Sequence, residues 1–379
     1  MTAVDRRERV FVNRDAVATL HGEAPARDPL DLHRRLPEYA PTPLRDAPGI
    51  ARDLGLDRLW VKDESQRMGL PAFKILGASW AVYRAIQQVL PNRTSRDGGE
   101  TLEEIARALE PLKPLTLSCA TDGNHGRAVA RMARLLGLDA HIFVPADMAP
   151  ARKAAIAGEG AGVTVVDGTY DDAVARSAEE ADERTLVISD TSWPGYEDVP
   201  RRVIEGYSTI FWEVEDEIRR RGEPGPNLVA VQIGVGALAA AVVRHYRRPD
   251  AAPRALILGV EPTRAACVLA SMEEGRIVQV PGPHDSIMSG LNCGLPSAIA
   301  WPLVSRGIDA FVAIEDERAR EGMRALAGEG IVAGECGAAG LAGLTTWLRS
   351  FGVEAAGRRA LVISTEGATD PEAYRRIVG

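Results

Sequence analysis

Short apolar runs alternate with helical patterns along most of this chain, and this alternation limits the folds that it can adopt. From residue 115 onward, runs rich in valine, isoleucine and leucine are each followed by a stretch with the spacing of an amphipathic helix. The expected strands are 115–120, 139–146, 163–168 and 185–190, and the expected helices between them are 124–137, 150–160 and 170–183. Strands that alternate with helices form a parallel sheet with right-handed crossovers.

A second series of the same kind follows the helical pattern at 205–221. Its expected strands are 228–234, 254–262, 309–316 and 359–367, with a helix at 237–248. A chain of 379 residues is also longer than a single core usually supports. We therefore predict an α/β protein of two parallel-sheet lobes with the active site in the cleft between them.

The domain boundaries follow from the positions of the two series. We expect a large cofactor-binding domain of residues 1–90 and 205–379, and a small α/β domain of residues 91–204. The polar stretch PNRTSRDGGE at 91–100 is the expected linker into the small domain. Ligands of such proteins commonly bind beyond the carboxyl ends of the strands.

Composition excludes several classes of function. A net charge of −8 disfavours nucleic acid and anionic membranes as partners. The sequence has neither the apolar core of a signal peptide at its start nor an apolar run of about 20 residues, so we expect a cytoplasmic protein. The cysteines form neither a CxxC pair nor a cluster with histidine, so no metal site is expected; they are Cys119, Cys267, Cys293 and Cys336.

One lysine stands in an apolar context. In LPAFKILGASWAVY, which begins at Leu70, Lys74 lies in the first turn of an expected amphipathic helix, between Phe73 and Ile75. A buried ammonium is costly, so Lys74 either extends its charge to the surface or serves as a reactive amine.

Polar groups follow three of the expected strands. QIGVGALAAAVV, from Gln232, places glycines between a strand and a helix, where backbone N–H groups can face an anion. SCATDGNHGRAVA, from Ser118, gathers Thr, Asp, Asn and His in a short loop, and VISTEGATDP, from Val362, ends a strand in hydroxyls and acids. Taken alone, each is also explained by a turn or a helix cap. Because the first segment has Ala239 in place of a third glycine, it does not match a dinucleotide-binding fingerprint.

Taken together, these features suit one cofactor. Pyridoxal phosphate requires an amine for a Schiff base, an anion site for its phosphate and hydrogen-bonding partners for its ring. Neither a zinc site nor a nicotinamide site would use all of these groups.

The motifs resemble the fold-type II pyridoxal-phosphate enzymes, the tryptophan synthase β-like group, and within it the diaminopropionate ammonia-lyase family. The resemblance runs from about Pro41 to the C-terminus, and five segments carry it: AFKILGASWA, ATDGNHGRAVA, SDTSWPGYEDVP, MSGLNCGLPS and STEGATDP. It implies an α,β-elimination that converts 2,3-diaminopropionate, as the D isomer, the L isomer or both, to pyruvate and two molecules of ammonia. It also implies a homodimer.

The resemblance assigns roles to residues of matching motifs. Lys74 would bind pyridoxal 5′-phosphate covalently, Asn124 would bond to its 3′ oxygen, and Thr365 would face its ring nitrogen, where a neutral hydroxyl favours an unprotonated ring. The residues expected at the phosphate are Gly234, Val235, Gly236, Ala237 and Leu238. Those expected at the substrate are Ala120, Thr121, Asp122 and His125, with Asp190 as a further catalytic acid.

Asp122 narrows the expected substrate. Threonine dehydratases have a hydroxyl residue at this position, which binds the substrate carboxylate, and an aspartate there would repel that group. A substrate with a second ammonium group, such as 2,3-diaminopropionate, removes the conflict. We expect Lys74 to remove the α-proton of the L isomer and Asp122, on the opposite face, that of the D isomer.

Several alternatives remain open. Another β-eliminating enzyme for serine-like or activated amino acids, or a β-replacement enzyme of a biosynthetic pathway, would use the same cofactor. A nucleotide-binding oxidoreductase or a binding protein of two α/β lobes would lack the cofactor altogether. The sequence also leaves open whether Cys267 and Cys293 form a disulfide, since cytoplasmic thiols are normally reduced.

Overall fold

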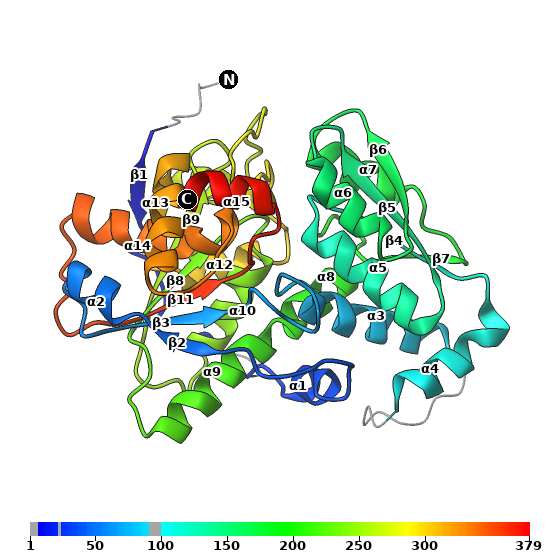
Figure 1. The fold of residues 1–379 in the computed structure, drawn as a ribbon, viewed down its shortest axis with the longest axis horizontal. Coiled ribbons are helices and arrows are strands. Elements are labelled where there is room, and N and C mark those ends of the chain that lie inside the picture. The colour runs from blue at the N-terminus through cyan, green and yellow to red at the C-terminus, as the bar shows by residue number, and fades with distance from the viewer. Residues whose placement is uncertain (1–6, 22–23, 91–99) are drawn as a thin grey trace. The chain divides into compact units, whose positions relative to one another are not determined.

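The protein is described by a computed structural model that covers residues 7–21, 24–90 and 100–379. It divides into two compact units, each labelled by element in Figure 1. The larger unit comprises Met1–Ala26, Pro41–Phe73 and Ile210–Gly379, and the smaller comprises Arg27–Ala40 and Lys74–Thr209. The expected linker at 91–100 lies almost entirely outside the described residues.

The larger unit contains a seven-stranded sheet with the order β1-β10-β9-β8-β11-β3-β2. The five inner strands are parallel, and the edge strands β1 and β2 are antiparallel to their neighbours. The strands are β1 (Arg9–Val12), β2 (Leu44–Asp46), β3 (Arg58–Asp63), β8 (Leu228–Gln232), β9 (Leu256–Pro262), β10 (Ala310–Ile314) and β11 (Arg359–Ser364). The predicted parallel strands are therefore confirmed, whereas the two antiparallel edges were not predicted.

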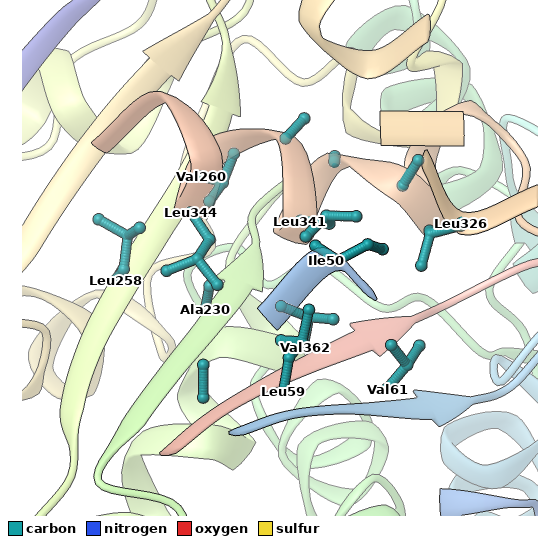
Figure 2. Close-up of a cluster of buried hydrophobic side chains, with 14 of the residues drawn as sticks. Ile50, Leu59, Val61, Ala230, Leu258, Val260, Leu326, Leu341, Leu344 and Val362 are labelled. Carbon is teal, nitrogen blue, oxygen red and sulfur yellow. The ribbon is translucent and has the colours of Figure 1, made fainter. Parts of the chain in front are cut away.

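Helices α2, α13 and α14 pack over one face of this sheet. Every second residue of the inner strands points into the shared core, as Leu59 and Val61 of β3 do, and Leu341 and Leu344 of α14 meet them (Figure 2). The helices of this unit are α2 (Pro48–Leu54), α9 (Ser208–Arg221), α10 (Ala237–Tyr246), α11 (Cys267–Glu274), α12 (Trp301–Gly307), α13 (Asp316–Gly328), α14 (Glu335–Ser350) and α15 (Pro371–Val378).

The smaller unit contains a four-stranded parallel sheet with the order β6-β5-β4-β7. Its strands are β4 (Thr116–Ala120), β5 (Asp139–Pro145), β6 (Gly162–Val166) and β7 (Thr185–Val187). Its helices are α1 (Asp28–His33), α3 (Ile75–Val89), α4 (Leu102–Leu109), α5 (Asn124–Leu136), α6 (Pro150–Ala157), α7 (Tyr170–Ala178) and α8 (Asp198–Gly206). Among the described residues, no helix is long and apolar enough to cross a membrane.

The two sheets share one topological feature. In the larger sheet the chain moves from β8 to β9 and β10 on one side and later adds β11 on the other side of β8. In the smaller sheet it moves from β4 to β5 and β6 and later adds β7 on the other side of β4. The strand order thus reverses between β8 and β11 and between β4 and β7, and ligands of α/β sheets bind at such positions.

Helix α3 packs differently from our expectation. We assigned residues 1–90 to the large domain, but 27–40 and 74–90 belong to the smaller unit, where α3 packs against α5 and α8. Small residues allow this close approach: a Cβ added to Gly206 of α8 would lie 2.3 Å from the carbonyl oxygen of Leu76. The helix itself was predicted correctly. The unit to which it belongs depends on the helices against which α3 packs, and the sequence pattern does not indicate these.

We expect Gly206→Ala to destabilise the protein by about 1–3 kcal/mol, because the atoms that it would meet belong to backbone and cannot rotate away. Gly328→Ala, also in a helix but with no atom within 4 Å of the added Cβ, is the matched control and should stay within about 1 kcal/mol of wild type. Denaturant unfolding of both variants measures this, and equal stability of the two would contradict the packing argument.

Candidate active site

The site residues of the smaller unit follow β4 and β7, the neighbouring strands at which its strand order reverses. Residues 121–125 come directly after β4, and Asp190 lies three residues after β7 ends. Lys74 is the N-cap of α3. The structure thus gathers the lysine and both predicted catalytic acids in a single unit.

Lys74 forms an ion pair with Asp190. The distance from Nζ to Oδ2 is 2.5 Å, and the Asp190 carboxylate is buried. The other carboxylate oxygen, Oδ1, accepts a hydrogen bond of 3.0 Å from the Tyr170 hydroxyl at the start of α7. Burial alone would raise the pKa of Asp190, but the charge of Lys74 and the hydrogen bonds from Lys74 and Tyr170 hold it well below its ordinary range. Asp190 is therefore a permanent anion beside the Lys74 amine.

The pKa of Asp122 is shifted in the opposite direction from that of Asp190. Burial and the neighbouring Asp190 carboxylate raise its pKa to about 8, against the opposing effect of Lys74 and Arg152. Two carboxyl groups of one site thus differ sharply in proton affinity, which is the usual basis for separate acid and base roles.

Thr121 and His125 are engaged in supporting this loop. The Thr121 hydroxyl oxygen accepts hydrogen bonds of 2.9 Å from the backbone N–H groups of Gly123 and Gly126 and so caps the start of α5. His125 donates from Nε2 to the Ile188 carbonyl, 2.7 Å away, and burial lowers its pKa. His125 is thus neutral, and its buried Nδ1 has no partner among the described residues. Asn124 is the first residue of α5, and Ala120 is the buried last residue of β4.

The site residues of the larger unit follow β8 and β11, the strands between which its order reverses. Gly234, Val235 and Gly236 form the turn after β8, and α10 begins at Ala237 and Leu238. Gly236 has a φ of 104°, a left-handed conformation that favours glycine. A Cβ at Gly234 would lie 3.1 Å from the Gly290 carbonyl oxygen. Glycine is therefore favoured at both positions.

The glycine turn fits a phosphate group. The N–H groups in the first turn of a helix have no carbonyl partner within that helix, and they carry the positive end of its dipole. The turn and the start of α10 therefore provide backbone donors for an anion. We find no group of three or more His, Cys, Asp or Glu suited to a metal ion among the described residues.

Thr365 is the first residue after β11, and its hydroxyl contacts the side chain of Gln232 at the end of β8. Both side chains are buried. Gln232 and Tyr170 were not predicted as site residues. Each occupies an ordinary position in a strand or helix pattern, and the only available signal was a polar residue next to a strand end or helix start.

The cysteines near the glycine turn are reduced in this structure. The Cys267 thiol lies 3.8 Å from the Gly234 carbonyl oxygen, and the Cys293 sulfur lies 3.2 Å from the position of a Cβ at Gly234. Both thiols therefore pack beside the same glycine.

The chain has only four lysines, which makes the candidate amine easy to identify. Lys62 is buried, with Nζ 2.6 Å from Glu213. Lys113 pairs with Glu110, and Lys153 donates to the Ala146 carbonyl in an exposed position. Only Lys74 is both part-buried and adjacent to the strand-end residues described above.

The raised pKa of Asp122 predicts a pH dependence of stability. The unfolded chain loses this proton near pH 4, whereas the folded protein keeps it until about pH 8. Between these values rising pH favours the unfolded state, and above pH 8 the effect is complete. We therefore expect Asp122→Asn, which mimics the protonated acid, to gain stability relative to wild type as pH rises from 4 to 8. Denaturant unfolding at several pH values tests this, and a constant difference would contradict it.

Comparisons with known proteins agree with this geometry. A family model described as "Pyridoxal-phosphate dependent enzyme" matches residues 35–366. The diaminopropionate ammonia-lyase of Salmonella typhimurium is 34% identical, over 96% of this chain and 94% of that protein. The crystal structure of the diaminopropionate ammonia-lyase from Escherichia coli in complex with D-serine superposes with a TM-score of 0.89 at 31% identity, covering 98% of this chain and 97% of that one.

A more distant likeness concerns the fold alone. Threonine deaminase isoform 2 from Solanum lycopersicum has a TM-score of 0.74 at 20% identity, over 100% of this chain and 92% of that one.

Proposed function

Since this chain belongs to the family of pyridoxal-phosphate dependent enzymes, we propose that it is a carbon-nitrogen lyase that eliminates ammonia from 2,3-diaminopropionate. Full-length similarity to proteins of that activity supports the proposal. The observation that carries it is that two acids, Asp122 and Asp190, follow the neighbouring strands β4 and β7 in the unit that contains Lys74, whose Nζ lies 2.5 Å from Asp190 Oδ2. This pair suits a substrate that carries two amino groups.

The residues present can hold the cofactor. Lys74 would bind it covalently through Nζ, and Gly234–Leu238 would receive its phosphate at the start of α10. Asn124 and Thr365 would contact the 3′ oxygen and the ring nitrogen, as the family resemblance implies. When bound, pyridoxal phosphate supplies an electron-accepting ring that stabilises the charge left at the α-carbon after loss of its proton.

The chain's own residues would move the protons. Lys74, once its amine is released, would remove the α-proton of the L isomer. Asp122 would remove that of the D isomer, and a pKa near the working pH suits a group that both accepts and donates a proton. Water would then convert the unsaturated product to pyruvate and a second ammonia.

Asp190 would act through charge. Its low pKa keeps it ionised, and it lies 2.5 Å from the Lys74 amine. An ionised Asp190 favours a cation at this point, whether the lysine ammonium or an ammonium of the substrate. Ala120, Thr121 and His125 would shape the substrate side of the loop, and the contacts of Thr121 and His125 favour a supporting role.

We further propose that the protein works in the cytoplasm as a homodimer. Its four reduced cysteines suit a reducing compartment. The family resemblance supports the dimer, and sedimentation of the purified protein would test it, since a monomer at all concentrations would contradict it.

Pyruvate release from D- and L-diaminopropionate tests the reaction. Wild type should release pyruvate from at least one isomer, faster than from serine or threonine. Asp122→Asn should lose about 10²- to 10⁴-fold in kcat on the D isomer, the range for removal of a general base, and much less on the L isomer. Equal loss on both isomers would refute the assignment of Asp122 to one face.

The same assay distinguishes elimination from β-replacement. An added thiol nucleophile should leave the pyruvate yield unchanged. A substituted amino acid formed in place of pyruvate would show that the chain is a replacement enzyme.

A further inference from the structure

Gln232 makes three close contacts through its side-chain nitrogen. Its Nε2 lies 2.7 Å from the Cys336 carbonyl oxygen, 3.0 Å from the Ile363 carbonyl oxygen and 2.9 Å from Thr365 Oγ1. Gln232 ends β8 and is only 3% exposed. It therefore bridges β8, β11 and the start of α14 inside the larger unit.

The two carbonyl groups fix the orientation of this amide. A reversed side chain would place Oε1 against the carbonyl oxygens of Cys336 and Ile363, and none of these oxygens carries a hydrogen. The amide nitrogen must therefore face them. Oε1 lies on the other side, buried without a hydrogen-bond partner among the described residues.

This orientation fixes the polarity of the Thr365 hydroxyl. The amide nitrogen has two hydrogens to share among these three oxygen atoms and cannot accept a hydrogen bond, so toward Gln232 the Thr365 Oγ1 can act only as an acceptor. The hydroxyl proton must then point away from Gln232. Thr365 is 4% exposed, and a buried hydroxyl proton without an acceptor is costly. The Thr365 hydroxyl proton therefore needs an acceptor other than Gln232.

We propose that Gln232 is a positioning residue that commits the Thr365 hydroxyl to donate to the cofactor's ring nitrogen and thereby keeps that nitrogen unprotonated. The proposal rests on the proposed function, in which Thr365 faces the ring. A freely rotating hydroxyl could either donate to a bare nitrogen or accept from a protonated one. Gln232 disfavours the second option. The hydroxyl oxygen has a second lone pair, but if it accepted from a protonated nitrogen its own proton would lack an acceptor, because the amide nitrogen of Gln232 cannot accept it.

An unprotonated ring is a milder electron sink than a protonated one. It suits the expulsion of a β-substituent more than reactions that need a long-lived carbanion. Gln232 would thus help to restrict the reaction type although it lies behind Thr365.

The protonation state of the ring can be measured directly. We would load the enzyme with pyridoxal phosphate carrying ¹⁵N in the ring and follow the nitrogen chemical shift from pH 6 to pH 9. Wild type should show the unprotonated shift throughout. Gln232→Glu replaces the donor by a carboxyl that can accept the Thr365 proton, and it should move the nitrogen to the protonated shift.

Two further variants complete the test. Gln232→Met, similar in size but unable to hydrogen-bond, should shift the protonation equilibrium of the ring about tenfold toward the protonated form, which is one pKa unit. Thr365→Ser keeps the hydroxyl and should match wild type.

The outcomes separate this inference from the proposed function. If wild type fails to bind the labelled cofactor, the proposed function is wrong. If the cofactor binds and wild type is protonated, or if the Gln232 variants that bind it keep the wild-type shift, the role of Gln232 is wrong and the function stands. If Gln232→Glu does not fold, Gln232→Met decides.

Discussion

The ion pair between Lys74 and Asp190 is the interaction on which the organisation of the smaller unit most depends. It joins Lys74, the N-cap of α3, to Asp190 in the segment after β7, with Nζ 2.5 Å from Oδ2. Asp190 is buried, so the pair offsets part of the cost of burying its charge. Removing Lys74 would leave the buried carboxylate uncompensated, although the cost is smaller than the roughly 3–5 kcal/mol of a fully buried pair because Lys74 is only part-buried. The close packing of α3 on α8, which requires glycine at residues 77 and 206, places the lysine where this pair can form.

Each sheet places its polar groups where its strand order reverses. Between β4 and β7 these are Asp122 and Asp190, and between β8 and β11 they are the glycine turn and Thr365. Ligands of α/β sheets bind beyond the carboxyl ends of the strands at such positions. Asp190 and Thr365 are nonetheless buried there, and their hydrogen bonds to Tyr170 and Gln232 offset part of the cost of burial.

Much of this arrangement could be predicted from the sequence. The parts that could not be predicted have one physical cause in common, which is that they depend on contacts between residues distant in sequence or lack a distinctive local pattern. Strands such as Leu228–Gln232 and helices such as Asn124–Leu136 have clear local patterns, and the structure contains them. The antiparallel edge strand Arg9–Val12 is short and half-exposed, so it has no distinctive pattern. The unit to which α3 belongs is decided by contacts with α5 and α8, which are distant in sequence.

The same holds for the site. Lys74 and Asp122 were identifiable because an ammonium and a carboxyl are conspicuous among apolar and small residues. The roles of Gln232 and Tyr170 depend on hydrogen bonds to residues 133 and 20 positions away, respectively, and the sequence contains no local sign of either.

The central claim is that Lys74 is the residue that binds pyridoxal phosphate. Borohydride reduction of the enzyme loaded with the cofactor, followed by peptide mass spectrometry, tests it directly, because the chain has only four lysines. We predict that the added mass lies on the peptide containing Lys74 and is absent from those containing Lys62, Lys113 and Lys153. Modification of one of those three lysines at the same stoichiometry, or no modification of Lys74, would contradict the account.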